Sequence, residues 1–278
     1  QWPVTPTIKS SVLWSPQAMT GTVLGGTVTP QKLYSWGHQT YLGFTSGTAR
    51  LTPTLVAEGH ASSLNFVNLA AGHDHTLALA WPQARLYGFG KNNAGQLGTS
   101  SNTDRATCTL VPNPTNVRKL AAGLQTSYAV DVTGRLFSWG VGGSGQLGVG
   151  LTSNQNAAQP VLSALSSLSV VAVAAGKTHA VALANAPREG YRLLFAWGAG
   201  ASNALGLGDV LDRTTPTLVD EEGAVFRHTF ITDIAAGDQY NLALSSDGLV
   251  YSWGKNDQSQ LGLGDTVSRS TPTIVRFA

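Results

Sequence analysis

The sequence predicts an all-β protein built from one repeated unit of short antiparallel strands. Three observations lead to this fold class. An aromatic block containing a fixed glycine recurs along the 278 residues, and a second block centred on Ala-Ala-Gly precedes each of the last four copies. No copy contains a long apolar run at helical spacing, so helices are not expected as the main elements.

The aromatic block occurs five times, and its first fixed glycine stands at positions 37, 90, 140, 198 and 254. Spacings of 50 to 58 residues are typical of arrays and propellers rather than of helical solenoids. The copies are LYSWGHQTYLG (33–43), LYGFGKNNAGQLG (86–98), LFSWGVGGSGQLG (136–148), LFAWGAGASNALG (194–206) and VYSWGKNDQSQLG (250–262).

Each unit has the pattern of a β-hairpin. In LAAGLQTSYAVDVTGRLFSWG, apolar and β-branched residues alternate over 127–132 and again over 136–139, and Thr133-Gly134 between them is typical of a tight turn. The Ala-Ala-Gly triplet has no bulk. It therefore predicts a strand whose backbone lies close to its neighbours, beside a crowded central axis.

Every aromatic block carries two rings, placed two residues apart. This step puts both rings on one face of a strand. Because all five copies have them, we interpret them as sheet-to-sheet packing residues rather than as a ligand cage. The first ring of each pair is Tyr34, Tyr87, Phe137, Phe195 or Tyr251, and the second is Trp36, Phe89, Trp139, Trp197 or Trp253.

Gly140, Gly142 and Gly145 have the literal spacing of a dinucleotide-binding motif, G-x-G-x-x-G. That motif must open a helix, whereas the residues that follow here are rich in Gly, Asn and Pro. The position of Gly142 is taken by Asn92, Gly200 or Asn256 in the other full-length copies. We interpret these residues as part of a turn, because Gly and Asn are the residues that tolerate a left-handed backbone. We therefore expect no cofactor.

Composition excludes several function classes. Charged residues make up 12% of the chain, the net charge is +2, and the basic residues are scattered, so bulk DNA or RNA binding is not expected. Cys108 is the only cysteine, which excludes an internal disulfide framework and a cysteine-based zinc site. His73 and His75 lack further metal ligands, and no nucleophile elbow or catalytic triad is evident. We therefore expect no metal and no catalysis.

The chain shows no membrane or secretion signal. No apolar run reaches the roughly 18 residues of a transmembrane helix, and residues 1–14 lack the basic start and continuous apolar core of a signal peptide. Since Gln1 is not an initiator methionine, we expect the chain to be processed, trimmed or part of a larger one.

The motifs AAGxxHTLAL, LYSWG and GQLGxG resemble the repeat of the regulator of chromosome condensation family. The resemblance runs from about Lys9 to Val275. It implies a β-propeller, commonly of seven blades, each a four-stranded antiparallel sheet around a central channel. Within a single domain over 1–278 we expect blades at 10–56 (degenerate), 57–111, 112–162, 163–219 and 220–278.

The blade ends predict a ring larger than five blades. TPTIK at Thr5 matches the blade end TPTIV at Thr271, so residues 1–9 are expected to end a preceding blade. That blade end is surplus to a closed five-bladed ring. We therefore expect this chain to form part of a larger propeller, with further blades from the same or another chain.

The resemblance implies a protein-binding scaffold or complex subunit without catalysis of its own. We expect an intracellular site, because members of the family occur in the cytoplasm, nucleus and mitochondrion. An alternative is a guanine-nucleotide exchange factor for a small GTPase, the activity of the best-known member, whose functional residues match no position here. A third alternative is a secreted propeller-type inhibitor.

Candidate partner-binding residues lie where a copy departs from the repeat, because exposed loops on a rigid scaffold commonly carry binding. The loop 184–192 and the segment 220–230 are longer than their equivalents, and the tips after two aromatic blocks carry charge. The candidates are Arg188, Glu189, Tyr191, Asp220, Glu221, Glu222, Phe226, Arg227, His228, Lys91, Asn92, Lys255 and Asp257.

Overall fold

The computed structural model describes residues 23–26, 32–37, 41–45, 49–57, 64–161, 163–186, 192–219, 226 and 229–277. In these segments nineteen strands form five antiparallel sheets. Two short 3-10 turns, at Ser163–Leu165 and Ala201–Asn203, are the only helical elements of the described part. The predicted all-β propeller fold is confirmed.

Each sheet pairs its strands in chain order, so every unit is a meander. The first sheet holds β1 (Val23–Gly26), β2 (Leu33–Gly37) and β3 (Arg50–Leu55), and the second holds β4 (Asn65–Ala71), β5 (His75–Trp81), β6 (Arg85–Gly90) and β7 (Arg105–Leu110). The third holds β8 (Val117–Ala122), β9 (Thr126–Asp131), β10 (Leu136–Gly140) and β11 (Gln155–Pro160). The fourth holds β12 (Ser169–Ala175), β13 (His179–Asn185), β14 (Arg192–Gly198) and β15 (Arg213–Leu218), and the fifth holds β16 (Ile231–Ala236), β17 (Tyr240–Ser245), β18 (Val250–Gly254) and β19 (Arg269–Val275).

The first sheet differs from the expected four strands, because only three of its strands are described. The start of that predicted blade, 10–22, and the predicted end of a preceding blade, 1–9, lie outside the described residues. The hairpin predicted around Thr133-Gly134 is confirmed as β9 and β10. Asp131 accepts hydrogen bonds at its Oδ1 from the backbone N–H groups of Thr133 (2.9 Å) and Arg135 (3.0 Å) and so closes the turn.

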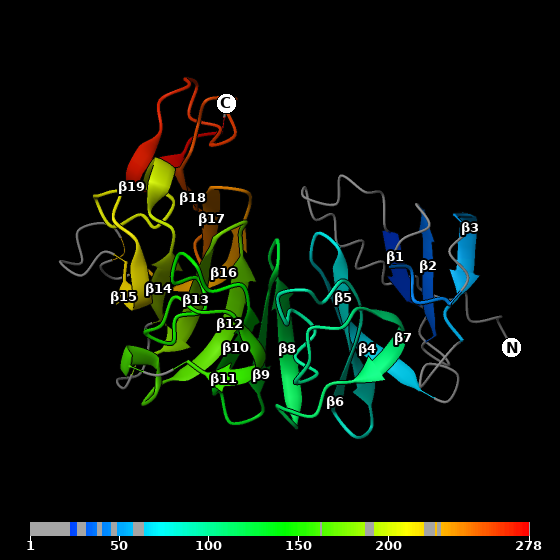
Figure 1. The fold of residues 1–278 in the computed structure, drawn as a ribbon. Helices are drawn as coiled ribbons and strands as arrows, with labels where there is room; N and C mark the ends of the chain where they lie inside the picture. Colours follow the sequence, from blue (N-terminus) through cyan, green and yellow to red (C-terminus); the bar gives the residue numbers. More distant parts are fainter. Residues whose placement is uncertain are drawn as a thin grey trace, which may run out of the picture.

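The sheets follow one another around an arc whose described ends, the first and fifth sheets, do not meet (Figure 1). The first strands of successive sheets, β4, β8, β12 and β16, contact one another in turn along its inner edge. A Cβ on Gly123 would lie 2.5 Å from the carbonyl oxygen of Gly176, and one on Gly176 would lie 2.6 Å from that of Gly237. The close approach predicted for the Ala-Ala-Gly triplet is confirmed, and only glycine fits there.

The hydrophobic core lies between the sheets rather than inside any one of them. Four buried clusters each join two consecutive sheets. Trp139, Trp197 and Trp253 are fully buried in these clusters. The indole Nε1 of Trp139 donates to the carbonyl of Gln96 (2.9 Å), and that of Trp197 donates to the carbonyl of Gln146 (2.9 Å). The interpretation of the rings as sheet-to-sheet packing residues is confirmed.

Each buried tryptophan lies against the last glycine of the preceding aromatic block. A Cβ on Gly98, Gly148 or Gly206 would come within 2.6 to 2.8 Å of the indole of the next sheet. These three glycines also have φ between 70° and 71°, a left-handed conformation that favours glycine. Backbone conformation and ring packing therefore both require glycine at this position, the indole-contact glycine.

The prediction of a left-handed backbone at the Gly142 position is wrong, because Gly142 does not have a positive φ. The positive φ occurs instead at the position of Gly145, where Asn203 and Ser259 stand in other copies. At Gly142 a Cβ would lie 2.2 Å from the carbonyl oxygen of Ser153, so the loop backbone fills the space of a side chain. In the copies with asparagine, that side chain occupies the space and bonds the loop itself.

Two sheet interfaces contain a buried histidine bonded to the next sheet. His75 Nε2 lies 2.9 Å from Ser127 Oγ, and this hydroxyl donates to the carbonyl of Gln96 (2.7 Å). His179 Nε2 lies 2.9 Å from Asn241 Oδ1. Since Ser127 Oγ donates elsewhere and Asn241 Oδ1 can only accept, both histidines must carry a proton on Nε2.

The interface between the third and fourth sheets has no such pair. Thr126 stands there at the position of the histidine, and Ala180 stands at the position of its partner. Burial lowers the pKa of His75 from 6.5 to about 4 and also lowers the pKa of His179. Nδ1 of each histidine is buried and has no hydrogen-bond partner among the described residues. A second proton there would therefore be unsatisfied, which adds to the cost of charging either ring.

We expect Trp197→Ala to lower the free energy of unfolding by about 3–5 kcal/mol, because it removes a ring buried between two sheets. Urea unfolding followed by circular dichroism measures this. Trp81→Ala is the matched control, because Trp81 is 59% exposed, and it should cost less than about 1 kcal/mol. Equal losses in the two variants would contradict the packing role of the aromatic block.

Stability should fall as the pH is lowered from about 6.5 towards 4. In this range the unfolded histidines bind protons that the buried ones do not, so protons favour the unfolded state. For His75 alone the pKa shift corresponds to about 3 kcal/mol at full effect. Urea midpoints at pH 7 and pH 5 measure the slope. His75→Gln should reduce that slope even if it destabilises at both pH values, and an unchanged slope would contradict the assignment.

Candidate functional site

The strand order places two sets of loops at opposite ends of each sheet. The loops after the Ala-Ala-Gly triplet and after the aromatic block share one end, which we call the loop face. Lys91 follows β6 and donates its backbone N–H to the carbonyl of Asp74, just before β5. The same bond recurs from Val141 to Gln125 and from Lys255 to Gln239. The repeat therefore brings the two loops together on every complete sheet described.

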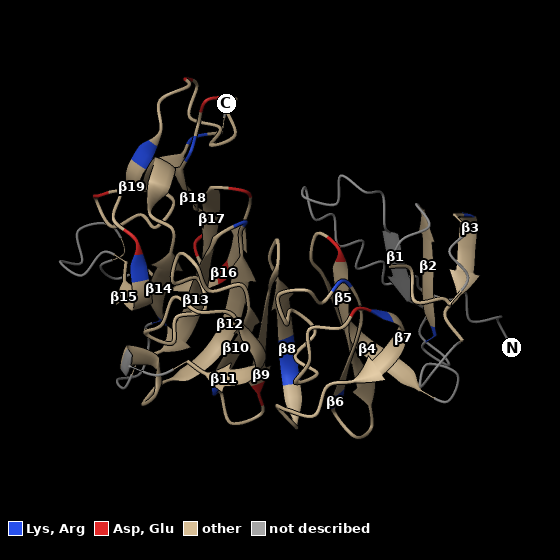
Figure 2. Cartoon of the chain, in the orientation of Figure 1, with Lys and Arg blue, Asp and Glu red and all other residues tan. Residues whose placement is uncertain are grey.

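Charged side chains are few on the ribbon as a whole (Figure 2). On the loop face of the second sheet, Asp74 lies between two basic groups. Its Oδ2 is 3.0 Å from His73 Nδ1 and 3.7 Å from Lys91 Nζ. The side chains of His73 and Lys91 are each 31% exposed. This cluster reaches solvent at the inner edge of the arc.

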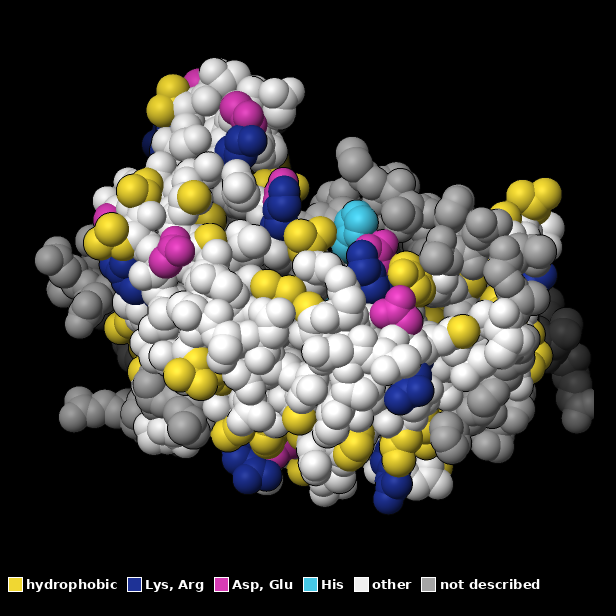
Figure 3. All heavy atoms as spheres, viewed as in Figure 1, with side chains coloured by type: hydrophobic (Ala, Val, Ile, Leu, Met, Phe, Trp, Pro, Cys, Tyr) yellow, Lys and Arg dark blue, Asp and Glu magenta, His cyan; other side chains and the backbone are white. Residues whose placement is uncertain are grey.

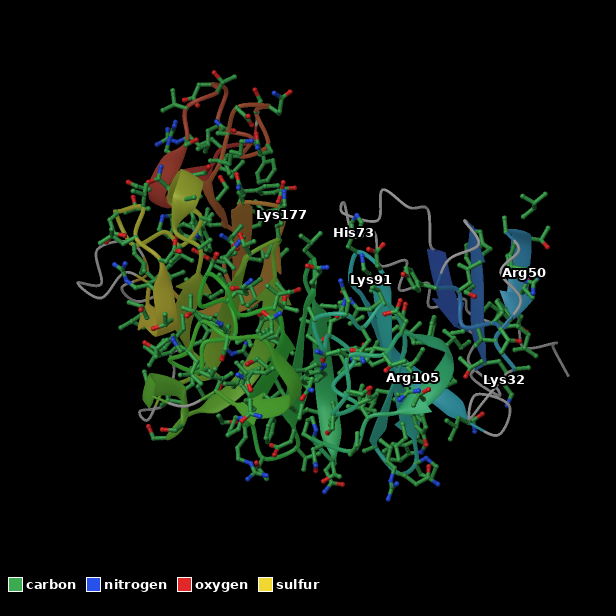
Figure 4. All side chains as sticks on the ribbon, in the orientation of Figure 1. Lys32, Arg50, His73, Lys91, Arg105 and Lys177 are labelled. Atoms are coloured by element: carbon green, nitrogen blue, oxygen red, sulfur yellow. The ribbon has the colours of Figure 1, made fainter. Side chains whose placement is uncertain are left out.

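The fourth and fifth sheets place further charges on the same face. Lys177 Nζ lies 3.9 Å from Asp238 Oδ1, and Lys255 Nζ lies 3.0 Å from Asp257 Oδ2. The hydrogen bond from Lys255 lowers the pKa of Asp257, which therefore stays ionised at neutral pH. In Figure 4, Lys177 lies on one side of the inner edge of the arc and His73 and Lys91 on the other.

The third sheet presents uncharged residues at these positions. Leu124 takes the place of His73 and Lys177, and Val141 takes the place of Lys91 and Lys255. Both are partly exposed. Hydrophobic atoms lie between the basic side chains at the inner edge of the arc (Figure 3). The loop face thus has an apolar centre on the third sheet with charged residues on both sides.

Asn92 supports the loop and does not reach its surface. It is fully buried, its Nδ2 donates to the carbonyls of Ser101 (2.8 Å) and Thr103 (3.1 Å), and its Oδ1 accepts from the N–H of Leu97 (2.8 Å). Asn256 makes the equivalent bonds in the fifth sheet. Lys91 and Lys255, which precede these asparagines, are therefore the residues of each pair that face solvent.

Phe226 is partly buried against the fifth sheet, where its ring meets Tyr251 edge-on with centroids 5.1 Å apart. It therefore anchors its segment to the sheet. The other candidates from the two long segments lie outside the described residues: Arg188, Glu189, Tyr191, Asp220, Glu221, Glu222, Arg227 and His228. Their role in binding stays a prediction.

Two observations bear on metal binding and on the reactivity of the single cysteine. No cluster of three or more His, Cys, Asp or Glu residues that could hold a metal occurs in the described segments. Cys108 is buried, and burial raises the pKa of its thiol to about 12, so it is not a nucleophile near neutral pH. Within the same segments, no helix has the length and apolar character needed to cross a bilayer.

The sequence-based candidates did not include His73, Asp74, Lys177 or Asp238. A usable signal exists, because these residues follow the glycine of the Ala-Ala-Gly triplet by one or two positions. At the position directly after this glycine, the third repeat has Leu124, whereas the other repeats have His73, Lys177 or Asp238. Repeat length is unchanged at this position, so insertions do not point to it.

Several known proteins are similar to this chain in sequence. The ultraviolet-B receptor UVR8 of Arabidopsis thaliana is 28% identical over 87% of this chain and 65% of its own length. Protein pim1 of Schizosaccharomyces pombe is 31% identical over 75% of this chain and 40% of its own length. The human probable E3 ubiquitin-protein ligase HERC4 is 31% identical over 77% of this chain and 20% of its own length. The chain thus spans less than two thirds of the length of each.

Solved structures show the same fold. Yeast RCC1 (Prp20) bound to Kap60 matches with a TM-score of 0.78 at 21% identity, over 93% of this chain and 60% of the yeast chain. Prp20p from Saccharomyces cerevisiae, studied for its binding to Gsp1p and histones, matches with the same score and identity over 62% of its length.

The sequence profile of the RCC1-like domain matches residues 17–278. This match spans nearly the whole chain and includes all five aromatic blocks and all five sheets. The chain therefore belongs to the RCC1-like domain family.

Proposed function

We propose that this chain is a protein-binding scaffold that holds its partner on the loop face and has no catalytic activity of its own. The observation that carries the proposal is the arrangement of Leu124 and Val141 between charged groups on the neighbouring sheets. A partly apolar centre with a polar rim is the usual anatomy of a protein interface. The likeness to propellers studied in complex with Kap60 or for binding to Gsp1p and histones supports a protein as the partner.

The charges of the loop face contribute little to the fold, which also supports a role in binding. Lys91, Lys177 and Lys255 have partly exposed side chains, and their contacts with aspartates are 3.0 to 3.9 Å long. Surface ion pairs of this kind typically stabilise a protein by less than about 1 kcal/mol. Binding therefore explains the recurrence of lysine on this face better than stability does.

The double variant Lys91→Glu, Lys255→Glu should weaken partner binding about tenfold, which is about 1.4 kcal/mol. Each substitution places a glutamate beside an existing aspartate, so the face becomes acidic. Affinity capture followed by mass spectrometry identifies partners of the unaltered chain, and titration of the purified partner against both proteins measures the change.

The control is the double variant Arg85→Glu, Arg135→Glu. It makes the same change in net charge at the opposite ends of the sheets, since Arg85 begins β6 whereas Lys91 follows it. Arg135 also has an aspartate partner, Asp131, at 2.9 Å. Equal loss of binding in the two double variants would contradict a specific role of the loop face.

Guanine-nucleotide exchange is the alternative to a scaffold without catalysis. Nucleotide release from candidate small GTPases, measured with a fluorescent guanine nucleotide, separates the two. We expect no acceleration by the chain. An acceleration that the Lys91→Glu, Lys255→Glu variant abolishes would replace the scaffold proposal by an exchange factor that uses the same face.

A further inference from the structure

The last strand of each sheet is an edge strand, which we call an outer strand, because only one described strand pairs with it. An unpaired edge can pair with another chain, and proline, which has no N–H, is one of the residues that prevent this. Strand β7, with the sequence Arg-Ala-Thr-Cys-Thr-Leu, contains no proline. Each of the other outer strands, β3, β11, β15 and β19, contains one: Pro53, Pro160, Pro216 and Pro272.

Two residues of β7 direct their backbone N–H groups away from the sheet. Val111 donates its N–H to the carbonyl of Leu86 on the neighbouring strand side (2.9 Å). Successive residues of a strand direct their N–H and C=O groups to opposite sides. Counted back from Val111, the N–H groups of Leu110 and Cys108 therefore point outward.

The prolines of the other outer strands occupy these same two positions. Pro160 corresponds to Leu110, since each lies opposite the first ring of its aromatic block. The other three prolines stand two residues earlier, at the position of Cys108: Pro53, Pro216 and Pro272. Among the described outer strands, only β7 therefore keeps an N–H group at both outward positions.

A second feature of β7 is an arginine without a polar partner. Arg213 and Arg269, which begin β15 and β19, each pair with an aspartate four residues earlier, at 2.7 and 2.6 Å. Arg105 begins β7, but Ser101 stands four residues before it. The Nε of Arg105 is buried and has no hydrogen-bond partner among the described residues. Since a buried polar group without a partner costs free energy, a carboxylate from outside would be stabilised there.

Asp104, the residue next to Arg105, is already engaged by other groups. Its Oδ1 accepts the backbone N–H of Asn92 (2.7 Å), and its Oδ2 accepts the hydroxyl of Tyr41 (3.3 Å). It therefore holds the loop of the second sheet and does not neutralise Arg105.

Both features of β7 favour the same occupant, an extended backbone that carries a carboxylate. The outward N–H groups need backbone carbonyls, and Arg105, at the start of β7, needs an anion (Figure 4). A second copy of this chain fits poorly through its own β7, because that strand has no acidic residue and would bring a second unpaired arginine. Residues 1–22 of this chain also contain no Asp or Glu.

We propose that the outer edge of β7 is a docking site for an acidic, extended segment of a partner protein, which adds to the second sheet as a further strand. Backbone carbonyls of the segment accept the N–H groups of Cys108 and Leu110, and its Asp or Glu side chain binds Arg105. This edge is a different surface from the loop face, so the proposal does not depend on the proposed function.

The test selects peptides from a phage-displayed random library on the purified full chain, after removal of the peptides that bind the Cys108→Pro variant. We expect the selected peptides to contain Asp or Glu and to be rich in β-branched residues. Fluorescence anisotropy then measures the affinity of a labelled synthetic peptide of the selected sequence. Cys108→Pro should weaken binding about tenfold or more, because it removes an N–H group and places a ring at the edge.

Cys108→Ala is the matched control. It removes the same thiol but keeps the N–H group, and Ala158 stands at this position in β11. It should therefore leave the affinity for the peptide unchanged. We expect Cys108→Pro to fold, because it creates the Thr-Pro-Thr-Leu sequence of β3 and β15, where Pro216 is buried as Cys108 is. Thermal unfolding of both variants checks this.

Ser101→Asp tests Arg105 without removing it. It supplies the internal partner that Asp209 gives Arg213. We expect an affinity loss of about fivefold, because the peptide carboxylate then competes with an internal one. Replacing the acidic residue of the peptide by its amide should cause a similar loss. With that amide peptide, Ser101→Asp should have no further effect, because the two changes remove the same interaction.

Several results would overturn the proposal. They are the absence of selected peptides, selected peptides without an acidic residue, equal affinities of Cys108→Pro and Cys108→Ala, and an unchanged affinity of Ser101→Asp. Protection of the Leu110 amide from hydrogen exchange in the free chain would also overturn it. So would a dimer that Cys108→Pro dissociates, because in both cases this chain itself would cover the edge.

Two variants separate this proposal from that of the loop face. Lys255→Glu, on the fifth sheet, should leave the affinity for the selected peptide unchanged. Cys108→Pro should leave binding of the loop-face partner unchanged. Failure of one proposal is thereby distinguished from failure of the other.

Discussion

The contact between an indole ring and a glycine of the neighbouring sheet is the interaction on which the rest of the structure depends. None of the described sheets has a core of its own, because the buried clusters lie between sheets. A sheet is therefore stable only when its neighbour supplies the other half of the core. The indole ties this packing to the loops as well, since Trp139 and Trp197 bond the loop carbonyls of the preceding sheet.

This arrangement separates the residues that stabilise the fold from those that are free to bind. The loops are held by buried asparagines, by glutamine side chains and by the indole N–H of the next sheet. Their exposed positions are not needed for these bonds and can differ between repeats. The variation from His73 to Leu124 to Lys177 at one position is possible because nothing in the core depends on it.

The fold was largely predictable because its determinants are local and repeated. The hairpin around Gly134 and the packing of the paired rings follow from alternation and from comparison between copies. The role of Gly142 was not predictable in this way. In some copies an asparagine side chain bonds the loop, and at Gly142 the carbonyl of Ser153 takes up the space of a side chain, whereas the sequence shows only that Gly and Asn alternate there.

The candidate site was predictable only in part, because exposure is a tertiary property. Lys91 and Asn92 are neighbours in one polar loop, yet one side chain reaches solvent and the other is fully buried. Only the buried asparagine side chain therefore contributes hydrogen bonds that hold the loop. The same argument applies to Leu79 and Leu244, which occupy one position of the repeat and are 4% and 40% exposed, because a described sheet packs only on Leu79. A repeat thus specifies what each surface can contact, whereas its place in the arc determines whether that surface remains available to a partner.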